Sequence, residues 1–306
     1  MKKMVAITGG TGLVGRALCT KLSESGYEIL VLSRNPEKVA NPIKGVTYIG
    51  WNIEQKKISP ELARAEVIVH LAGVPVMAKR WTDEFKKEIV DSRVNSAELL
   101  VDFLRNNTHD VKQFVTSSAI GWYGPDNGRQ PFTEDMPAHA GFLGTTCRMW
   151  EAASQPVNGL GIRWNAVRTG IVLSSNGGAF LEFYNPVKFH IAPILGSGRQ
   201  SISWIHIDDL CGIYQHLIEN PVEGAINGVA PLPVTNKELV LTLARQKAGS
   251  IFLPVPVPAI VLNAVLGESS IEVLKSATVS SAKIENNGFR FKFPTIGDAV
   301  RNLASG

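Results

Sequence analysis

Three glycines near the start of the chain carry the strongest chemical signal in the sequence. Gly9, Gly12 and Gly15 lie three residues apart, between an apolar β-type run and a segment of helical periodicity. A glycine in such a turn lets the backbone approach a diphosphate, whose charge is favoured at the N-terminus of the next helix. We predict a dinucleotide cradle here rather than a plain glycine-rich turn. The predicted cradle residues are Gly9, Thr11, Gly12, Leu13, Val14 and Gly15.

The residues after the next apolar run indicate which dinucleotide the chain binds. An acidic residue at this point would hydrogen-bond the 2′-hydroxyl of the adenosine ribose of NAD. The chain has Ser33 and Arg34 there instead, with Lys38 one turn later. A carboxylate would repel a 2′-phosphate, whereas an arginine can pair with it. We therefore expect NADP(H), the alternative being that Arg34 is only a solvated surface charge.

Small residues at later strand ends complete the predicted cofactor site. Leu71, Ala72 and Gly73 follow an apolar run, where the chain must pass close beneath a ribose or the nicotinamide. A routine strand-to-loop turn is the alternative for this stretch. The other predicted cofactor contacts, from two further strand ends, are Ser117, Thr169 and Gly170.

These residues need a parallel sheet whose strands all end at one edge. Strand and helix signals alternate along the first half of the chain. The expected strands are 4–7, 28–32, 46–51, 67–71, 113–117 and 165–168, and the expected later helices are 82–105, 142–153 and 206–220. Thr82 is the expected N-cap of the first of these helices, and Asp208 or Asp209 that of the last. The alternation predicts an α/β fold with a Rossmann-type, doubly wound parallel sheet.

The pattern changes after Leu173, where glycines, prolines and aromatic residues separate short elements. Such segments predict a smaller C-terminal α+β cap over the carboxyl ends of the strands, where open α/β sheets bind ligands. The tail at 288–294 is expected to form a short strand. We predict an NADP-binding Rossmann domain over 1–173, with 205–230 packing back onto it. The predicted substrate-binding cap comprises 174–204 and 231–306.

Composition bounds the environment and the partners. The chain has 306 residues and a formal net charge of +4 without a long basic run, which favours an anionic small ligand over a nucleic acid. No stretch is long enough to cross a membrane, so a membrane partner is not expected. Three widely spaced cysteines provide neither metal spacing nor a disulfide framework. A reduced, cytoplasmic setting without a metal is the resulting expectation.

By these motifs the chain resembles the extended short-chain dehydrogenases/reductases. It is most similar to their atypical branch of NAD(P)-dependent sugar-nucleotide epimerase-like proteins, also called cell-division-inhibitor-like. The resemblance covers essentially the whole chain. The stretches that carry it are 8–15, 70–73, 91–93, 121–124, 150–151, 168–173, 196–200, 203–209, 227–231 and 288–291.

The catalytic pattern of the wider superfamily is missing from the chain. Those enzymes use a serine after the fifth strand and a Tyr-x-x-x-Lys pair on the next helix, in which the tyrosine moves a proton and the lysine holds the nicotinamide ribose. Alignment on Glu151 puts Leu143 and Cys147 at the pair's positions. Tyr184 and Lys188 have the right spacing, but they follow the sixth strand and enclose Pro186, which is expected to disrupt the helix turn between them. We regard that match as coincidental.

Other residues are candidates for the missing roles. Tyr123, just beyond the fifth strand, could reach a substrate oxygen, or it could be a loop anchor. Ser118 keeps a hydroxyl in one alignment, whereas another places Ala119 at the serine position. Arg148 could bind ribose or a substrate anion, or pair with Glu151. We predict Tyr123, Ser118 and Arg148 as the catalytic residues.

The segment after residue 195 supplies the predicted substrate contacts. Arg199 offers a bidentate fork to phosphate or carboxylate, and the resemblance places this region in the substrate cleft. The predicted substrate-binding residues are Arg199, Gln200 and Trp204. For His206, N-terminal capping with a buried hydrogen bond is favoured over catalysis.

Two functions are compatible with these residues. The first is an NADP(H)-dependent oxidoreductase or epimerase-like enzyme on a small sugar-like or anionic substrate, lacking the Tyr-x-x-x-Lys pair. The second is a catalytically silent NADP(H)-binding module that senses redox state or recognises a protein partner. The resemblance also allows a homodimer through the helix at 82–105.

Overall fold

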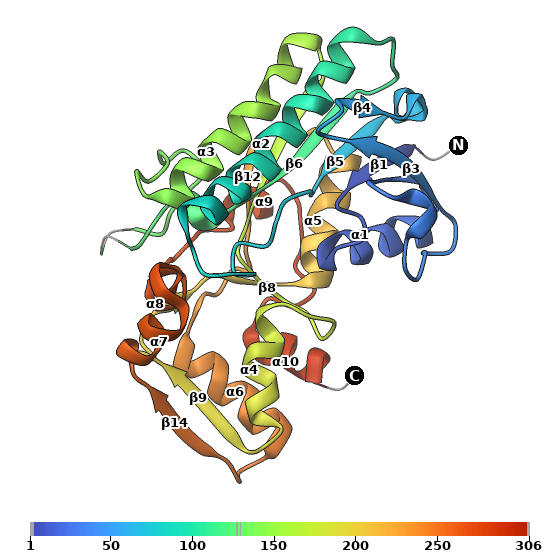
Figure 1. The fold of residues 1–306 in the computed structure, drawn as a ribbon. Helices are drawn as coiled ribbons and strands as arrows, with labels where there is room; N and C mark the ends of the chain where they lie inside the picture. The colour runs from blue at the N-terminus through green and yellow to red at the C-terminus, as the bar shows by residue number, and fades with distance from the viewer. Residues whose placement is uncertain (1–2, 127, 129, 305–306) are drawn as a thin grey trace.

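An eight-stranded sheet forms the centre of the computed structural model, which describes residues 3–126, 128 and 130–304 (Figure 1). Its strands are β1 (Met4–Thr8), β2 (Glu28–Ser33), β3 (Val46–Asn52), β4 (Lys57–Ile58), β5 (Val67–His70), β6 (Gln113–Ala119), β7 (Arg163–Thr169) and β12 (Gly224–Gly228). Their order is β12-β7-β6-β5-β1-β2-β3-β4, and every pairing except β3–β4 is parallel. The expected doubly wound parallel sheet is therefore confirmed, with a short antiparallel edge strand that the pattern did not reveal.

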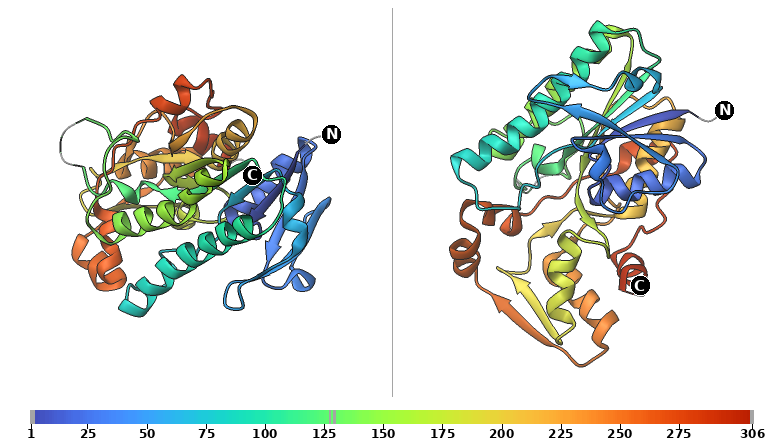
Figure 2. Two further views of the ribbon diagram at one scale, coloured as in Figure 1. Left: turned by 90° about the horizontal axis from the view of Figure 1, so that it is seen from above. Right: turned by 45° about the vertical axis from the view of Figure 1, so that its right-hand side comes forward.

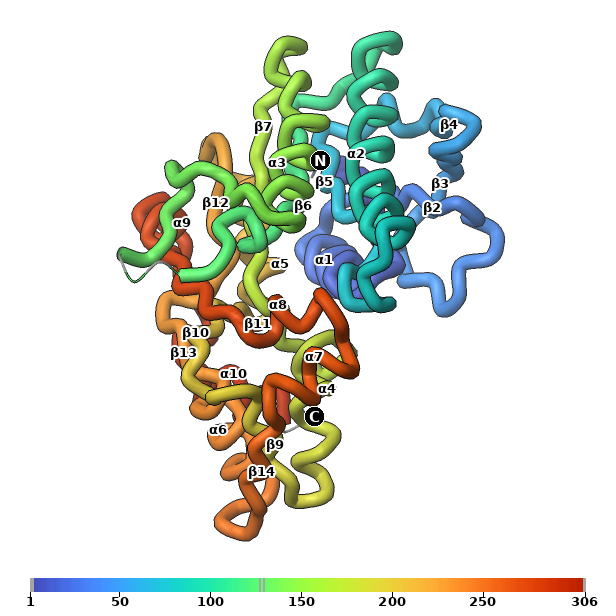
Figure 3. Tube along the Cα trace, turned by 60° about the vertical axis from the view of Figure 1, so that its left-hand side comes forward, coloured from blue at the N-terminus to red at the C-terminus, as the bar shows by residue number. Residues whose placement is uncertain are grey.

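Helices cover both faces of this sheet. α1 (Leu13–Glu24) and α5 (Ile207–Glu219) pack together on one face, and α2 (Asp83–Asn106) and α3 (Phe142–Ser154) pack together on the other, as the views in Figures 2 and 3 show. Because both faces are covered, β1, β2 and β5 are apolar along almost their whole length, whereas β6 and β7 also bury polar side chains. α2 begins where its sequence predicts, since the Thr82 hydroxyl accepts from the Phe85 N–H at 3.2 Å.

A smaller unit lies beyond the carboxyl ends of the strands (Figure 1). Its main elements are α4 (Ala179–Val187), β9 (Ile191–Leu195), α6 (Asn236–Ala248), β14 (Leu253–Val257), α7 (Ala259–Leu266) and α10 (Ile296–Ala304). β9 and β14 form a parallel pair, and α4, α6 and α10 enclose a hydrophobic core of their own. This is the expected α+β cap.

Short strands and helices connect the two parts. β8 (Ile171–Leu173) pairs with β11 (Trp204–His206) directly beyond β7, and β10 (Ser201–Ile202) pairs with β13 (Val234–Thr235). α8 (Ile271–Leu274) and α9 (Ala282–Asn286) follow in the C-terminal segment. None of the helices in the described ranges is both long and apolar enough to cross a membrane.

Two local expectations were wrong. The N-cap of α5 is His206, whose Nδ1 accepts from the Asp208 N–H at 3.0 Å, so neither aspartate caps this helix, although the capping role favoured for His206 itself is confirmed. The Asp209 carboxylate instead accepts from the N–H groups of Lys292 and Phe293 at 2.7 and 2.9 Å. These bonds tie the tail to α5, and the tail at 288–294 forms no strand.

Candidate functional site

The carboxyl ends of the parallel strands bring the predicted cofactor residues to one edge of the sheet. In the register, Thr8 lies opposite His70, His70 opposite Thr116, and Ala119 opposite Thr169. The loops that leave these strands therefore start side by side. Thr11, Ser33, Gly73, Ser117 and Thr169 are at least partly accessible in the loops or at the strand ends, as a ligand site requires.

The glycine loop has the geometry of a diphosphate cradle. Gly9 has a positive φ of 66°, and a Cβ there would lie 2.9 Å from the Leu71 carbonyl. A Cβ on Gly15 would lie 2.2 Å from the Gly9 carbonyl oxygen, so only glycine lets α1 start this close to β1. Gly12 is the N-cap of α1, no side chain caps that helix, and no acidic residue lies in its first turn. The first N–H groups of α1 thus remain open to an anion.

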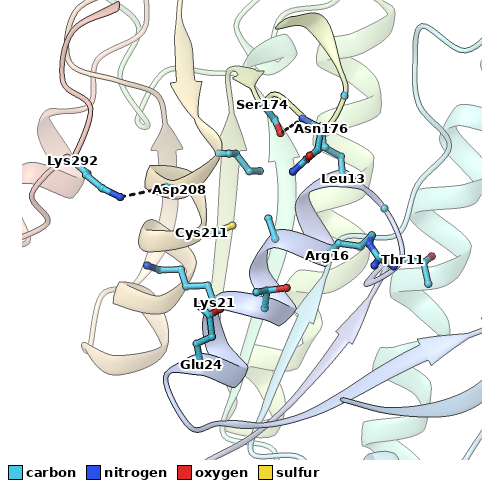
Figure 4. Close-up of a pocket in the computed structure, with 15 residues that line it drawn as sticks. Thr11, Leu13, Arg16, Lys21, Glu24, Ser174, Asn176, Asp208, Cys211 and Lys292 are labelled. Atoms are coloured by element: carbon cyan, nitrogen blue, oxygen red, sulfur yellow. Dashed lines mark hydrogen bonds and ion pairs between the residues drawn. The ribbon is translucent and has the colours of Figure 1, made fainter. Parts of the chain in front are cut away.

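Cations that are exposed or half-buried lie beyond β2 and near the glycine loop. Ser33 ends β2, with Arg34 and Lys38 exposed just beyond it. Arg16, on the first turn of α1, extends towards Thr11 at the glycine loop (Figure 4). Arg16 is a further cation that the sequence interpretation did not single out.

A buried histidine joins the glycine loop to the end of β5. The Thr8 hydroxyl accepts from the N–H groups of Leu71 and Ala72, both at 3.1 Å, so its own proton is directed to Nδ1 of His70 at 2.8 Å. Ser96 Oγ donates to the Ser92 carbonyl at 2.7 Å, which leaves it to accept from His70 Nε2 at 3.1 Å. Burial lowers the pKa of His70 to about 4. His70 is therefore a neutral Nε2–H tautomer that holds Leu71 and Ala72 in place.

A cavity of about 940 Å³ borders the glycine loop between α1, α5 and the turn at 174–177. Figure 4 shows Leu13 pointing towards Ser174 and Asn176, and Asp208 paired with Lys292 on the opposite wall. Thr11, Gly12 and Leu13 are the predicted cofactor residues that line this cavity. The Arg34 and Gly73 regions lie outside it, so the cavity overlaps the predicted site at the diphosphate loop alone.

Two of the three predicted catalytic residues belong to a buried polar network. The Tyr123 side chain is 4% exposed, and its hydroxyl donates to Asn227 Oδ1 at 2.6 Å and accepts from Arg168 Nη1 at 3.0 Å. Burial raises the pKa of Tyr123 to about 12, which the nearby Arg168 only partly offsets. Ser118 Oγ donates to Glu151 Oε1 at 2.7 Å. This geometry favours the loop-anchor interpretation of Tyr123 over proton transfer, because the hydroxyl has two partners and no access to a cleft.

A buried ion pair is the centre of the same network, and sequence reasoning missed it. Arg168 Nε and Nη2 donate to the two Glu151 oxygens at 2.9 and 3.0 Å, and both side chains are almost completely buried. The Arg168 guanidinium also lies 3.6 Å from the centre of the Trp122 ring. Both residues lie in stretches that carry the family resemblance, Trp150-Glu151 and Arg168–Leu173, so the signal was available. The two opposite charges therefore pair with each other between α3 and β7.

α3 carries Leu143 and Cys147 one turn apart, where the resemblance expects the tyrosine and lysine. The Cys147 thiol donates to the Ala119 carbonyl at 3.6 Å, and burial raises its pKa to about 11. Cys147 is therefore a neutral thiol at neutral pH. Arg148 is exposed on the next position of α3, and Glu151 is engaged with Arg168 rather than with Arg148.

The predicted substrate residues divide into one exposed and two buried side chains. Arg199 is exposed in the loop before β10. Gln200 donates to the carbonyls of Leu195 and Val273 at 2.9 and 3.2 Å, and Trp204 donates to that of Leu232 at 2.9 Å. Gln200 and Trp204 thus shape the cap through backbone contacts.

Two further expectations can be compared with the structure. A Cβ on Gly170 would lie 2.5 Å from the Ser203 carbonyl oxygen, so the close approach of β11 already requires this glycine. Tyr184 and Lys188 lie in the cap, with Pro186 inside the last turn of α4 rather than disrupting it. α4 packs against α6 and β9, away from the strand that precedes α3.

The comparisons with known proteins agree with this geometry. Residues 5–143 match the model of the NAD dependent epimerase/dehydratase family, and residues 257–303 match a domain of unknown function, DUF1731. The chain is 33% identical to epimerase family protein YfhF of Bacillus subtilis over 98% of this chain and 97% of YfhF. It belongs to this epimerase family.

The similarity to a solved structure covers nearly the whole chain. The crystal structure of human epimerase family protein SDR39U1 (isoform 2) with NADPH is 32% identical, with a TM-score of 0.88 and 99% coverage of both chains. A Thermotoga maritima UDP-glucose 4-epimerase with UDP-glucose is only 18% identical at a TM-score of 0.79, and it supports the fold alone. The expected atypical branch of the extended short-chain dehydrogenases/reductases is thereby confirmed.

Proposed function

We propose that this epimerase family member is an NADP(H)-dependent oxidoreductase or epimerase-like enzyme acting on a small sugar-like or anionic substrate. The observation that carries the proposal is the glycine turn at the N-terminus of α1, where no side chain caps the first N–H groups and a cavity borders the loop. Human SDR39U1, which is similar over its full length, was crystallised with NADPH, and this supports the same cofactor here.

The chain's own residues would bind and orient NADP(H). The N–H groups at Leu13 and Val14 would bind the diphosphate, and Arg34 would pair with the 2′-phosphate. Leu71, Ala72 and Gly73, held by His70, would line the ribose and nicotinamide, together with Ser117 and Thr169. The bound cofactor supplies the hydride chemistry. Exposed Arg199 would attract an anionic group of the substrate.

We further propose that Tyr123 and Ser118 stabilise the carboxyl ends of β6, β7 and β12 instead of moving protons. Both hydroxyls are engaged within the buried network. Arg148 keeps an exposed guanidinium and remains the predicted catalytic residue that is accessible to a ligand.

The alternative function is a catalytically silent NADP(H)-binding module. Burial of Tyr123 and the neutral Cys147 thiol favour it, because neither side chain can take over the role of the missing pair. Turnover of any substrate would exclude this alternative.

The wider proposals concern organisation and environment. The division into a Rossmann domain at 1–173 with 205–230 and a cap at 174–204 and 231–306 is supported by the separate hydrophobic core of the cap.

A homodimer through α2 would depend on charged side chains, because the exposed positions of that helix include Lys87, Glu88 and Glu98. A cytoplasmic setting is supported by three buried, unpaired cysteines.

Binding of NADPH and NADH to the purified protein tests the cofactor assignment. We expect NADPH to bind at least tenfold more tightly, and Arg34→Ala to remove that difference while NADH affinity is unchanged. Arg105→Ala, an exposed arginine at the far end of α2, is the control and should retain the preference. Equal affinities in the wild type would refute the NADP(H) assignment.

A substrate screen tests the activity. Carbonyl compounds and nucleotide sugars would be scored by NADPH oxidation and by product analysis, because an epimerase recycles its hydride. With a substrate in hand, Tyr123→Phe should change kcat less than threefold. A loss above a hundredfold in a variant of unchanged stability would restore Tyr123 as the proton donor.

A further inference from the structure

The end of the cap that lies farthest from the central sheet exposes four apolar side chains. Two turns meet there, at 188–190 between α4 and β9 and at 249–252 between α6 and β14, at the lower end of the molecule in Figure 1. Phe189, Ile251, Leu253 and Ile191 are 77%, 75%, 65% and 40% exposed. Exposed apolar side chains gathered at one place indicate a binding surface. We call residues 185–191 and 245–253 the cap tip.

Hydrogen bonds hold the two turns of the cap tip together. His190 has a positive φ of 61°, and its Nδ1 donates to the Ile251 carbonyl at 2.5 Å. The Leu253 N–H donates to the His190 carbonyl at 2.8 Å. In the register of β9 with β14, Leu253 lies opposite Ile191, so their side chains are on the same face of the pair. The exposed apolar side chains are thus neighbours in a fixed arrangement.

The cap tip carries basic side chains and no acidic ones. Lys188, Arg245 and Lys247 are exposed there, and neither of its two segments contains an aspartate or a glutamate. The Nζ atoms of Lys188 and Lys247 lie 4.9 and 5.5 Å from the centre of the Tyr184 ring, which brings cations of both turns together. Within the described residues, no ion pair includes any of these three cations. Their charge is therefore available to an anionic partner.

The edge strand beside these side chains restricts what can bind. The Leu253 N–H and the Val257 carbonyl point towards β9. Pro254 and Pro256, at the alternate positions, therefore face the outer edge of β14. Proline has no N–H, so this edge cannot donate to an added strand from a peptide or from a second copy. The positive charges of two facing tips would also repel each other.

We propose that the cap tip binds the surface of an anionic lipid bilayer. The four apolar side chains enter the boundary between headgroups and acyl chains, and Lys188, Arg245 and Lys247 bind the lipid phosphates around them. Such a contact lies on the bilayer and needs no spanning helix, so the lack of a spanning stretch does not oppose it. α1 and the central sheet lie at the other end of the molecule (Figure 1), so the candidate site remains open in this orientation.

Flotation of the full chain with lipid vesicles tests the contact. Vesicles of phosphatidylcholine alone are compared with vesicles that also contain phosphatidylglycerol, at low and at high salt. We expect wild type to bind the anionic vesicles at least tenfold more tightly, and high salt to remove most of that difference. Phe189→Ser/Ile251→Ser and Lys188→Gln/Lys247→Gln should each lower binding to anionic vesicles at least tenfold. Their Tm should be unchanged, because all four side chains are exposed.

Matched changes elsewhere separate the cap tip from general effects. Leu232→Ser/Ile260→Ser removes two exposed aliphatic side chains outside the tip. Lys57→Gln/Lys112→Gln removes the same charge from exposed positions at the central sheet. Neither control should change vesicle binding more than twofold. In wild type, anionic vesicles should slow amide hydrogen exchange at 188–191 and 249–253 and leave that of β4 unchanged.

Each contrary result overturns the proposal in its own way. Wild-type binding that is absent, or equal for neutral and anionic vesicles, would show that the tip does not recognise an anionic bilayer. An equal loss for the tip lysine pair and the control lysine pair would reduce the effect to net charge. A loss with the tip lysine pair but none with the apolar pair would favour an acidic protein surface. A wild-type dimer in sedimentation velocity that Phe189→Ser/Ile251→Ser makes monomeric would assign the tip to self-association.

Discussion

His70 shows how a single buried residue links stability to pH. The folded protein keeps His70 neutral with a pKa of about 4, whereas an unfolded histidine titrates near 6.5. Between these values the unfolded chain binds more protons than the folded chain, so stability falls as the pH falls. The contribution is fully present above pH 6.5, and about 2 kcal/mol of it is lost between pH 7 and pH 5 by this linkage.

Replacing His70 with asparagine should flatten this dependence. The amide cannot titrate in this range, and its oxygen can still accept from the Thr8 hydroxyl. We expect the free energy of unfolding of His70→Asn, measured with urea at pH 7 and at pH 5, to change by about 2 kcal/mol less than that of the wild type. Parallel pH profiles for the two proteins would show that His70 is not the group responsible.

Residue identity alone indicated the cofactor loop but not the roles of the polar residues behind it. Gly9, Gly12 and Gly15 were predictable because their chemistry is local to a turn. From the sequence, the Tyr123 hydroxyl was expected to reach a substrate. In the fold it is bound by Asn227 and Arg168, which lie 104 and 45 residues away in the chain.

Gly12 and Gly15, where β1 leads into α1, are expected to be needed for different reasons. Gly15→Ala would place a methyl 2.2 Å from the Gly9 carbonyl oxygen and 2.6 Å from Gly10 Cα, so the backbone must move. We expect it to lower the free energy of unfolding by about 1–3 kcal/mol and to weaken NADPH binding. Gly12 has an ordinary φ of −79°, and its Cβ would lie 3.3 Å from the nearest atom. Gly12→Ala should leave unfolding within about 0.5 kcal/mol of wild type.

The expected difference between the two variants lies in ligand binding. Gly12→Ala should still weaken NADPH at least tenfold, because its methyl would occupy the approach of the diphosphate. Gly159→Ala is the control, since a Cβ there meets nothing within 4 Å. Chemical denaturation and NADPH titration give both values for each variant. Tight NADPH binding by Gly12→Ala would exclude the diphosphate from this turn.

The start of a helix could be predicted from the sequence where the contact that determines it joins residues close together in the chain. Thr82 caps α2 through Phe85, three residues on, as the pattern predicted. The α5 cap followed only in part: the capping role favoured for His206 is confirmed, but neither aspartate caps the helix, and Asp209 binds the backbone of Lys292 and Phe293 in the tail. Asp208 and Asp209 lie inside α5, after its N-cap, and only the folded tail reveals the partners of Asp209.

At the scale of the whole molecule, the C-terminal segment at α7 contacts the loop before α2 and the first turn of α2. Arg80 donates through Nε to the Val265 carbonyl at 2.8 Å and through Nη2 to the Ala264 carbonyl, at the last turn of α7. Lys86 of α2 forms an ion pair with Glu268 just beyond α7. Carbonyls at a helix C-terminus lack partners within the helix and favour a cation. These contacts connect the loop after Gly73 to the segment that matches DUF1731.

We expect Arg80→Ala to loosen this connection without affecting the sheet. Amide hydrogen exchange of α7 and α8 should accelerate several-fold, because opening that segment no longer breaks the two Arg80 bonds. Exchange in β1 and β5 should be unchanged, since their hydrogen bonds lie within the sheet. Lys79→Ala is the matched control, because Lys79 pairs with Glu88 of α2 and, within the described part of the chain, has no hydrogen bond or ion pair with α7. Equal acceleration in β1 and in α7 would mean that the segment and the sheet open as one unit, and that Arg80 does not fasten a separately mobile cap.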